Sequence, residues 1–545
     1  MAPPQTDLCK DIIPAETLSR VTALSSTPTS DGSGRRHHDF GRERDAPPSF
    51  PRIIRILPSS HILKLPVMAS TIELHNTGPS PIPLTVLIVG AGFAGLAAAI
   101  ECHRHGLKPI VIEKFRALKP LGDIISFASN SSRIFERWPG VAEQMEPITL
   151  RPKDGFGIRA STTGETLLQQ VWTEEQNSWG NRYDGHRGEY HTIVFRHAVE
   201  DLGIDVRLGA GVADYFETDE DGGSAGVVLE SGERITADVV IAAEGVRSKG
   251  RTTVLGYEDR PKPSGYAVYR SWFETKDTIA KDPDLRWLIE GGDKHIAWLA
   301  PDIHFIIAVL KDGQDISWVC THRDTEDIDE SWQLEAPLAD ARKVLAGWEP
   351  TIQKILDRTP EPLVDWKLVF RDPLEKWISP LRRIALIGDA AHPFLPTSIQ
   401  GASQSMEDGA TIAVCLRKAC ERAAAATSQT NGDTTADTRA RAVKEAVATF
   451  EALRYERVKS AQKTGTQTRD IWHKADFVAA RKDPQSLRLR REAWLLNFDA
   501  ERYAEEWYDR TADAVREKGV VEARKLHVPE GARFGFMEYE TQPVS

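Results

Sequence analysis

Cysteine is scarce in this chain of 545 residues, and no two cysteines have the spacing of a metal site or of a disulfide framework. The five that occur are Cys9, Cys102, Cys320, Cys415 and Cys420. An odd number without a CxxC motif argues against a zinc site and against a secreted, disulfide-bonded fold. The pattern is typical of a reducing compartment, so we expect a cytoplasmic protein without a metal site.

Excess positive charge and long apolar runs are also lacking. Acidic residues outnumber basic ones by 80 to 69, and the net charge of −11 gives no electrostatic footprint for nucleic acid. No stretch approaches the about 18 to 20 consecutive apolar residues of a membrane span. With 41% hydrophobic residues, the chain is expected to fold into two or three soluble domains with a large core.

Residues 1–80 lack a persistent helical or strand period. A Ser/Thr/Gly-rich stretch, a mixed-charge run and recurring prolines predict a disordered extension. A transit peptide is an alternative because of the arginines, although the acidic residues count against it. A third alternative is that Met68 is the physiological start.

The ordered pattern begins at residue 84. The apolar run Leu84–Val89 leads into glycines at 90, 92 and 95 and then into an Ala-rich helix. Gly90 makes a tight turn, Gly92 lets a pyrophosphate approach the backbone, and Gly95 lets the helix pack on the strand. The next strand ends at Glu113, which can accept hydrogen bonds from an adenosine ribose. These features predict a dinucleotide site for FAD or NAD rather than NADP, against the alternative of an ordinary glycine-rich turn.

Later patterns indicate two further kinds of structure. Aromatic-rich strands between Ser264 and Thr321 predict an antiparallel sheet inserted into the α/β part. Residues 332–355 and 403–423 are predicted to be helical, and 424–438 is of low complexity. The composition from Arg441 to Lys518, with many i,i+4 charge pairs, predicts a solvated helical cap.

Two more motifs accompany the glycine-rich turn. A buried strand ends at Gly388-Asp389, where a carboxylate can face a ribitol hydroxyl, and Gly401-Ala402 opens a helix whose N–H groups can face a flavin pyrimidine. A turn aspartate beside a helix start is common in any sheet. The third stretch, Asp238–Arg251 with Glu244-Gly245, disfavours that alternative because three separated motifs then agree.

In this order and spacing the three stretches resemble the FAD-dependent aromatic monooxygenases of the salicylate hydroxylase and para-hydroxybenzoate hydroxylase type, above all fungal secondary-metabolism members. The resemblance covers about residues 84–420. It implies an α/β fold: a Rossmann-like FAD-binding domain of the glutathione-reductase type, with an inserted antiparallel substrate sheet and a helical C-terminal region. The boundaries that we expect are 1–80 for the extension, 81–260 and 331–423 for the FAD-binding domain, 261–330 for the substrate sheet, 424–440 for a flexible linker, and 441–545 for the helical region.

The resemblance also assigns roles to residues. It implies ADP contacts for Gly90, Gly92, Gly95 and Glu113, a phosphate contact for Arg187, FAD and NAD(P)H contacts for Glu244, a ribitol contact for Asp389, and isoalloxazine contacts for Gly401 and Ala402. The chain departs from the family at two places. The family's Asp-Gly is Glu244-Gly245 here, which is one methylene longer, and the loop at 122–125 lacks its second glycine.

The implied chemistry is that NAD(P)H reduces FAD, O2 forms a C4a-hydroperoxide, and an electron-rich aromatic attacks its distal oxygen. A cation near the substrate oxygen would favour the phenolate. Arg270 matches in position an arginine of the family's substrate pocket, and Trp298 stands where some relatives have tyrosine, so these two are the predicted catalytic residues. Strand alternation puts Arg270 on one face with Tyr266 and Val268, while a surface arginine is the alternative.

The predicted function is NAD(P)H- and O2-dependent hydroxylation of a phenolic or polyketide-derived aromatic, with decarboxylation left open. An epoxidase and a non-catalytic FAD-binding relative remain alternatives. A halogenase is disfavoured because Trp-x-Trp-x-Ile-Pro is absent, and a plain NAD dehydrogenase would not need Gly388-Asp389. His295 and His392 are expected to be structural rather than catalytic bases. The oligomeric state stays open.

Overall fold

The computed structural model describes residues 80–118, 123–324, 334–429 and 436–532. The chain divides into two compact units, Met1–Thr71 and Ile72–Ser545, and every structural statement below concerns the second unit. The predictions made for residues 1–79, including the start at Met68, lie outside the described residues.

Five parallel strands form the sheet that carries the motifs, in the order β18-β11-β1-β2-β7. They are β1 (Thr85–Val89), β2 (Lys108–Glu113), β7 (Asp205–Leu208), β11 (Val239–Ala242) and β18 (Ile384–Leu386). Parallel sheets are buried on both faces, which is why β1, β11 and β18 read as continuous apolar runs. Because parallel strands end at the same edge, the glycine-rich turn and the two later motifs come together there.

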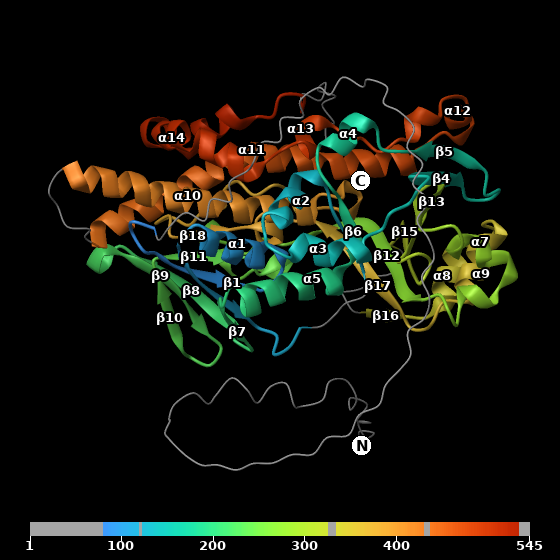
Figure 1. Ribbon diagram of the computed structural model, residues 1–545, viewed down its shortest axis with the longest axis horizontal. Coiled ribbons are helices and arrows are strands. Elements are labelled where there is room, and N and C mark those ends of the chain that lie inside the picture. The colour runs from blue at the N-terminus through green and yellow to red at the C-terminus, as the bar shows by residue number, and fades with distance from the viewer. Residues whose placement is uncertain (1–79, 119–122, 325–333, 430–435, 533–545) are drawn as a thin grey trace, which may run out of the picture. The chain divides into compact units, whose positions relative to one another are not determined.

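Helices cover one side of this sheet. Helix α1 (Phe93–Arg104) packs on the long helix α10 (Gly401–Gln429). They cross closely at Gly409, where a Cβ would lie 2.7 Å from the Ala98 nitrogen. Helices α11 (Ala436–His473), α14 (Ala500–Lys518) and α15 (Val520–Arg524) complete the layer. Figure 1 shows α10, α11 and α14 on one side of the parallel strands and the small sheet β10-β9-β8 on the other.

The remaining elements of the motif-bearing part are short. They are α2 (Ser129–Glu136), α3 (Val141–Met145), α4 (Glu174–Ser178), α5 (Arg187–Arg196), α6 (Gly250–Leu255), the strands β8 (Val212–Thr218), β9 (Ser224–Leu229) and β10 (Arg234–Ala237), and the pair β3 (Ile124–Phe127) and β6 (Tyr183–His186). Helices α12 (Phe477–Lys482) and α13 (Ala493–Leu496) follow α11. No helix among the described residues is both long and apolar enough to cross a membrane.

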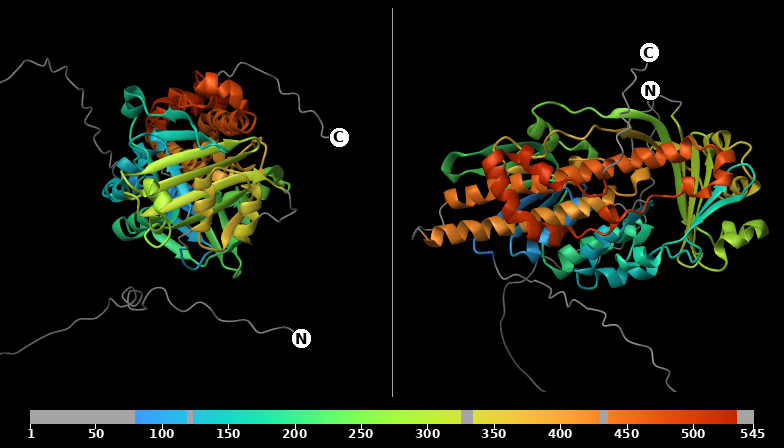
Figure 2. Two further views of the ribbon diagram at one scale, coloured as in Figure 1. Left: turned by 90° about the vertical axis from the view of Figure 1, so that its right-hand side faces the viewer. Right: turned by 90° about the horizontal axis from the view of Figure 1, so that it is seen from above.

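A second, eight-stranded sheet has the order β16-β17-β12-β15-β14-β13-β4-β5. Its strands are β4 (Phe156–Ala160), β5 (Thr166–Gln170), β12 (Lys262–Glu274), β13 (Lys294–Ala300), β14 (Ile303–Leu310), β15 (Asp315–Arg323), β16 (Leu334–Ala336) and β17 (Leu363–Phe370). All neighbours are antiparallel except β13 and β4. The left view of Figure 2 shows these strands side by side.

This sheet extends beyond the expected range of 261–330. The hairpin β4-β5 joins it through β13, and β16 and β17 come from the region assigned to the FAD-binding domain. Residues 332–355 are not continuously helical, because Leu334–Ala336 pairs with β17 before α8 (Leu338–Val344) and α9 (Pro350–Asp357) begin. Pairing between strands that are distant in sequence leaves no local pattern to detect.

The register gives the eight-stranded sheet two distinct faces. Tyr269, Cys320, Phe305 and Trp298 are successive cross-strand partners on the outer face. They belong to a buried cluster that includes residues of α7 (Arg286–Ile289), α8 and α9. One residue further along each strand, Arg270, Val319, Ile306 and Ala297 form the opposite face, which we call the inner face.

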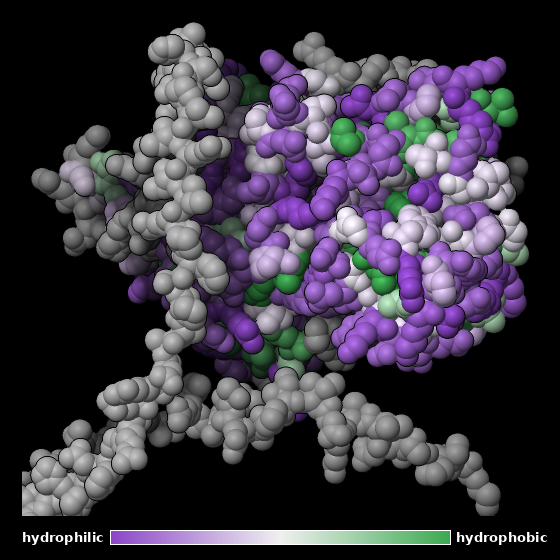
Figure 3. Space-filling model, turned by 45° about the vertical axis from the view of Figure 1, so that its right-hand side comes forward, coloured by the Kyte–Doolittle hydropathy of each residue, from purple (hydrophilic) through white to green (hydrophobic). Residues whose placement is uncertain are grey.

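Figure 3 shows small, separate hydrophobic groups among hydrophilic residues on the molecular surface.

The C-terminal helices differ from expectation in two respects. Helix α10 continues to Gln429 and α11 begins at Ala436, so the described ends of the predicted linker are helical, and residues 430–435 lie outside the description. Helix α11 is not a solvated cap. Phe450, Arg454 and Val458 are at most 1% exposed, because α11 packs directly on α10.

Candidate active site

The glycine-rich turn has the geometry that its motif predicts. Gly90 has a φ of +105°, and a Cβ there would lie 2.5 Å from the Ala243 carbonyl oxygen. A Cβ on Gly95 would lie 1.9 Å from the Gly90 oxygen, so the helix can approach the strand only with glycine at this position. A Cβ on Gly92 would meet nothing within 4 Å, which leaves open space before the first turn of α1. Its N-cap has no side-chain hydrogen bond, so backbone N–H groups can bind a phosphate there.

Two side chains from neighbouring elements hold this turn. Glu113, at the end of β2, accepts hydrogen bonds from the backbone N–H groups of Ala91 (2.9 Å) and Phe115 (3.0 Å). His191 of α5 lies with Nε2 2.6 Å from the Ala91 carbonyl oxygen. Burial lowers the pKa of His191, so the neutral ring donates this bond. The structure thus gives Glu113 a role in fixing the turn, and its ribose contact stays a prediction.

The motifs around residues 244 and 389 are joined by a buried arginine. Arg251 donates hydrogen bonds to the carbonyl oxygens of Asp389 (2.8 Å), Ala390 (3.0 Å) and Val246 (2.9 Å). Burial lowers the pKa of Arg251 to about 10, so the group stays cationic at neutral pH. Because these bonds use the backbone of residue 389, the Asp389 side chain remains available to a ligand.

Glu244 makes hydrogen bonds within its own motif. Its Oε2 accepts from Ser248 Oγ (2.7 Å) and from the Gly250 backbone N–H (3.0 Å). These donors lie just before α6 and at its first residue. The predicted cofactor contact of Glu244 is untested, and the structure gives its carboxylate a role in shaping the loop.

Four charged side chains from separate segments converge between the two sheets. Arg270 of β12 is 6% exposed, and its Nη1 donates a hydrogen bond to Asp123 Oδ2. The Arg187 backbone N–H donates to the Asp123 carbonyl oxygen (2.8 Å), and the charge of Arg187 acts on both Asp123 and Asp389. Burial raises the pKa of Asp123, and Arg270 and Arg187 lower it. The cluster therefore joins the substrate sheet to the cofactor motifs.

The inner face of the large sheet supports this position of Arg270. Its guanidinium lies 5.6 Å from the ring centroid of Trp366, and Trp272, two residues further along β12, contacts His186 at 4.6 Å between ring centroids. His186 caps α5 by accepting from the Glu189 N–H, next to Arg187. The alternative of a surface arginine is therefore wrong.

Trp298 lies on the outer face, away from Arg270. It is fully buried, and its indole N–H donates to Glu349 Oε1 (2.7 Å). Successive cross-strand pairs place it on the same face as Tyr269, which is opposite to Arg270. The predicted substrate contact does not fit this position, because a strand separates the indole from the inner face. We do not include Trp298 in the proposed site.

The helix start at residue 401 is also close to the predicted motif. A Cβ on Gly401 would lie 3.3 Å from Phe394 Cβ, and Ser405 Oγ donates to the Gly401 carbonyl oxygen (2.9 Å). The neighbouring residue Ala402 is partly exposed. Phe394 belongs to the loop after Asp389, so the two motifs meet at the N-terminus of α10.

Three contributors were not assigned roles from sequence. Asp123 stands in the loop that departs from the family pattern, and Arg251 ends the third motif. Asp408 of α10 accepts hydrogen bonds from the Gly388 N–H (2.9 Å), and its Oδ2 lies 2.6 Å from His392 Nε2. A buried acid that lies 16 residues from His392 and 20 from Gly388 along the chain has no local signal in the sequence. An acid directly after a motif glycine, as at Asp123, is the one signal that sequence inspection could have used.

The residues fit an FAD molecule. The groups available to a ligand are the open backbone before α1, the cation of Arg187, and the carboxylates of Glu113 and Asp389 at the ends of two strands. A pyrophosphate group can approach the backbone closely only where there is no side chain, and Gly92 leaves this space open. Gly90, Gly92 and Gly95 would hold the pyrophosphate, Glu113 the ribose, Asp389 the ribitol, and Gly401 and Ala402 the flavin ring.

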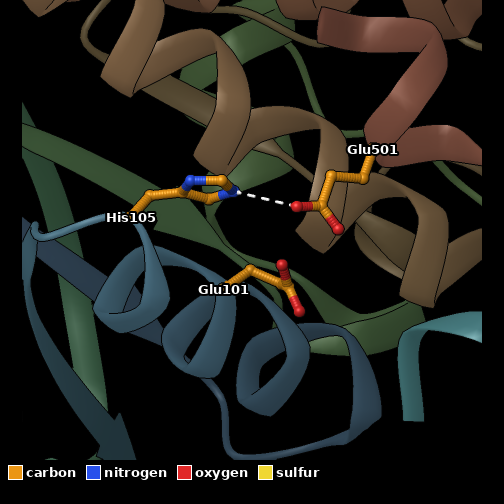
Figure 4. Close-up of side chains that lie close together, drawn as sticks. All are labelled: Glu101, His105 and Glu501. Carbon is orange, nitrogen blue, oxygen red and sulfur yellow. Dashed lines mark ion pairs between the residues drawn. The ribbon is translucent and has the colours of Figure 1, made fainter. Parts of the chain in front are cut away.

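A separate group of acidic and histidine side chains lies between α1 and α14. Figure 4 shows Glu101, His105 and Glu501, whose ligand-type atoms lie within 4.8 Å of one another. Arg104 and Arg137 already bind these carboxylates, the latter with Nη1 2.9 Å from Glu501 Oε2. This composition is that of an ion-pair network that ties α14 to α1.

Comparison with known proteins identifies the family. A model described as FAD binding domain matches residues 83–450. The Asperlicin C monooxygenase of Petromyces alliaceus is 31% identical over 82% of this chain and 92% of its own length. The FAD-dependent monooxygenase nanF of Aspergillus nanangensis is 33% identical over 85% and 96%.

Solved structures give the same result. CtdE in complex with FAD and a substrate superposes with a TM-score of 0.70 at 32% identity, covering 80% of this chain and all of that one. Salicylate hydroxylase, at 23% identity and a TM-score of 0.60, shares the fold over 77% of this chain and 97% of that one. The glycine-rich turn, the Asp389 turn and the inserted sheet are therefore those of a flavoprotein, and this chain belongs to the FAD-dependent monooxygenases of the flavoprotein hydroxylase fold.

Proposed function

We propose that this monooxygenase hydroxylates a phenolic or polyketide-derived aromatic in secondary metabolism, with NAD(P)H and O2 as co-substrates. The observation that carries the proposal is the buried Arg270–Asp123 pair on the inner face, next to Arg187 and Asp389. The balanced reaction consumes the aromatic C–H, O2, NAD(P)H and a proton, and releases the phenol C–OH, water and NAD(P)+. FAD, when bound, supplies the hydride acceptor and the oxygen activation.

The protein's own residues supply binding and electrostatics. Arg187 and Arg270 both act on the Asp123 carboxylate, and Arg187 also acts on Asp389, so Arg270 is the cation that the substrate sheet contributes to the cluster. A fixed cation in a site of low dielectric stabilises the negative charge that develops on a phenolic oxygen. Asp123 holds the Arg270 guanidinium in one orientation, which avoids reorganisation during the reaction. The similarity to Asperlicin C monooxygenase, whose name refers to a fungal metabolite, supports a secondary metabolite as the substrate class.

The first test is spectroscopic and kinetic. The purified protein is expected to show a flavin spectrum and to oxidise NADH or NADPH in air faster when a suitable phenol is added. The product is expected to gain one oxygen atom, measured by mass spectrometry. A flavin-bound protein whose NAD(P)H oxidation no phenolic compound accelerates would overturn the substrate class. Conversion of an alkene substrate into an epoxide would favour the epoxidase.

Arg270 is tested by substitution. Arg270→Gln removes the cation but keeps hydrogen-bond donors for Asp123, so we expect flavin content to stay and kcat to fall about 100-fold or more. The matched control is Arg323→Gln, which removes an arginine that is 59% exposed on the neighbouring strand. Substrate-dependent turnover of Arg270→Gln at the rate of the control would remove Arg270 from the site.

A further inference from the structure

One face of α11 contacts three separate parts of the molecule. Gly465 and Trp472 follow Arg454 by 11 and 18 residues. At 3.6 residues per turn, this spacing places the three residues within about 20° of one another around the helix axis. They are spread over about 27 Å along the helix axis. Figure 2 shows α11 running from the region of α10 to the large sheet.

The first contact reaches the cofactor turn. Arg454 Nε donates to Asp408 Oδ1 (2.8 Å), and Asp408 Oδ2 accepts from the Gly388 N–H. His392 lies against the same oxygen at 2.6 Å. All three side chains are at most 1% exposed, so the turn that carries Asp389 is held by a dry ionic network.

The second contact reaches the loop between that turn and α10. A Cβ on Gly465 would lie 3.1 Å from Ser398 Cβ and 3.4 Å from Leu395 Cβ. The Gly465 carbonyl oxygen accepts a hydrogen bond from Thr397 Oγ1 (2.7 Å), and Gln462 donates to the Pro393 oxygen (3.1 Å). Glycine inside a helix is destabilising relative to alanine, so its presence here needs a reason. Close approach of the loop is the reason for a glycine here, because its φ is not in the left-handed region.

The third contact reaches the large sheet. The ring of Trp472 stacks on Phe156 of β4 with centroids 6.0 Å apart, and the Trp472 N–H donates to the Leu487 oxygen (3.0 Å). His473 Nε2 lies 2.8 Å from His304 Nδ1 on β14. One helix thus contacts the cofactor turn, the loop that follows it and the sheet that carries Arg270.

We propose that Gly465 is a positioning residue, which sets the position of the loop Pro393–Gln400 between the Asp389 turn and the first turn of α10. The inference rests on the proposed function and deepens it. Oxygen transfer requires the reacting atoms to be placed to within fractions of an ångström. A methyl group at residue 465 forces Ser398 to move by a few tenths of an ångström. The moved loop is continuous with Asp389 at one end and with Gly401 and Ala402 at the other, the residues that would hold the ribitol and the flavin ring.

The test uses Gly465→Ala in the full-length holoenzyme, with Thr466→Ala as control because that neighbour is exposed. We expect the visible flavin band of Gly465→Ala to shift and the yield of hydroxylated product per NAD(P)H to fall about threefold to tenfold, with hydrogen peroxide making up the difference. Titration of the apoprotein with FAD, followed by fluorescence, is expected to show weaker binding than in the control. An unchanged spectrum, affinity and yield would overturn the proposal.

A rescue experiment separates positioning from loss of stability. Ser398→Gly in the Gly465→Ala background removes the 3.1 Å contact, so we expect the product yield to return toward that of Ser398→Gly alone. A double variant as uncoupled as Gly465→Ala, or a yield that only follows the thermal midpoint, would overturn the proposal. FAD affinity and the flavin spectrum do not depend on the substrate. A wild-type protein that binds FAD but hydroxylates no phenol would therefore contradict the proposed function, while these two measurements would still test the role of Gly465.

Discussion

At the scale of single residues, the backbone and the side chain of Asp389 have separate roles. Arg251 donates hydrogen bonds to the carbonyl oxygens of Asp389 and Ala390, which fixes the turn. Burial raises the pKa of the Asp389 carboxyl group, while the charges of His392 and Arg187 act to lower it. A partly buried carboxylate surrounded by cations is a strong acceptor for ligand hydroxyls.

Asp389→Ala should therefore weaken FAD binding without unfolding the turn. Loss of a hydrogen bond to a charged group costs about 1.5–3 kcal/mol, or about tenfold to a hundredfold in the dissociation constant. Flavin content after purification and fluorescence titration measure this. Asp357→Ala is the control, since that aspartate is 57% exposed in an ion pair with Arg342. A variant that purifies with full flavin would contradict the assignment of Asp389.

At the scale of elements, the approach of α1 to β1 defines the phosphate end of the site. Gly95 lies against the Gly90 oxygen, and Glu113 and His191 hold Ala91 from both sides. Each of these contacts fixes the turn before any ligand is present. The open space at Gly92 is the consequence.

Gly95→Ala is expected to move α1 away from the turn. The added Cβ would meet a backbone oxygen at 1.9 Å, and overpacking of this kind costs about 1–3 kcal/mol. The thermal midpoint and the FAD dissociation constant should both change for the worse. His103→Ala, at an exposed position of the same helix, should leave both as in the wild type. If Gly95→Ala matched it, the close approach would not matter to the site.

At the scale of the whole molecule, buried neutral histidines join the helical layer to the large sheet. Burial lowers the pKa of His304 to about 3 and of His473 to about 4, and the two rings share one hydrogen bond. Between these values and the unfolded pKa of about 6.5, the unfolded chain binds more protons than the folded protein. The free energy of unfolding therefore increases as pH rises through that window, and the protein loses this stability as pH falls.

The expected result is a urea midpoint that drops steadily from pH 6.5 to pH 4. His304→Asn keeps a hydrogen-bonding atom beside His473 but cannot titrate, so its slope should be smaller by about 1.4 kcal/mol per pH unit. Denaturation curves at several pH values provide the measurement, with the variant's stability at pH 7.5 as reference. Equal slopes in both proteins would show that His304 is protonated in the folded state.

Sequence and structure agree where the signal is local. Gly90 and Gly95 occupy the predicted turn and Glu113 the predicted end of β2, because these strands, the turn and the helix follow one another in the chain. Alternation correctly grouped Arg270 with Val268, since side-chain direction along one strand follows a period of two. Trp298 is instead assigned from the family resemblance, and only the pairing of β13 with β14 and of β14 with β15 shows that it lies on the face opposite to Arg270.

The sequence by itself determined the FAD-binding family and the three motifs, because each motif depends on residues close together in the chain. The tertiary structure decided the rest. It joined β4, β5, β16 and β17 to the large sheet, brought Asp123 to Arg270, and laid α11 across both parts. These contacts join residues far apart in sequence, and the burial and pairing that select them exist only in the folded chain.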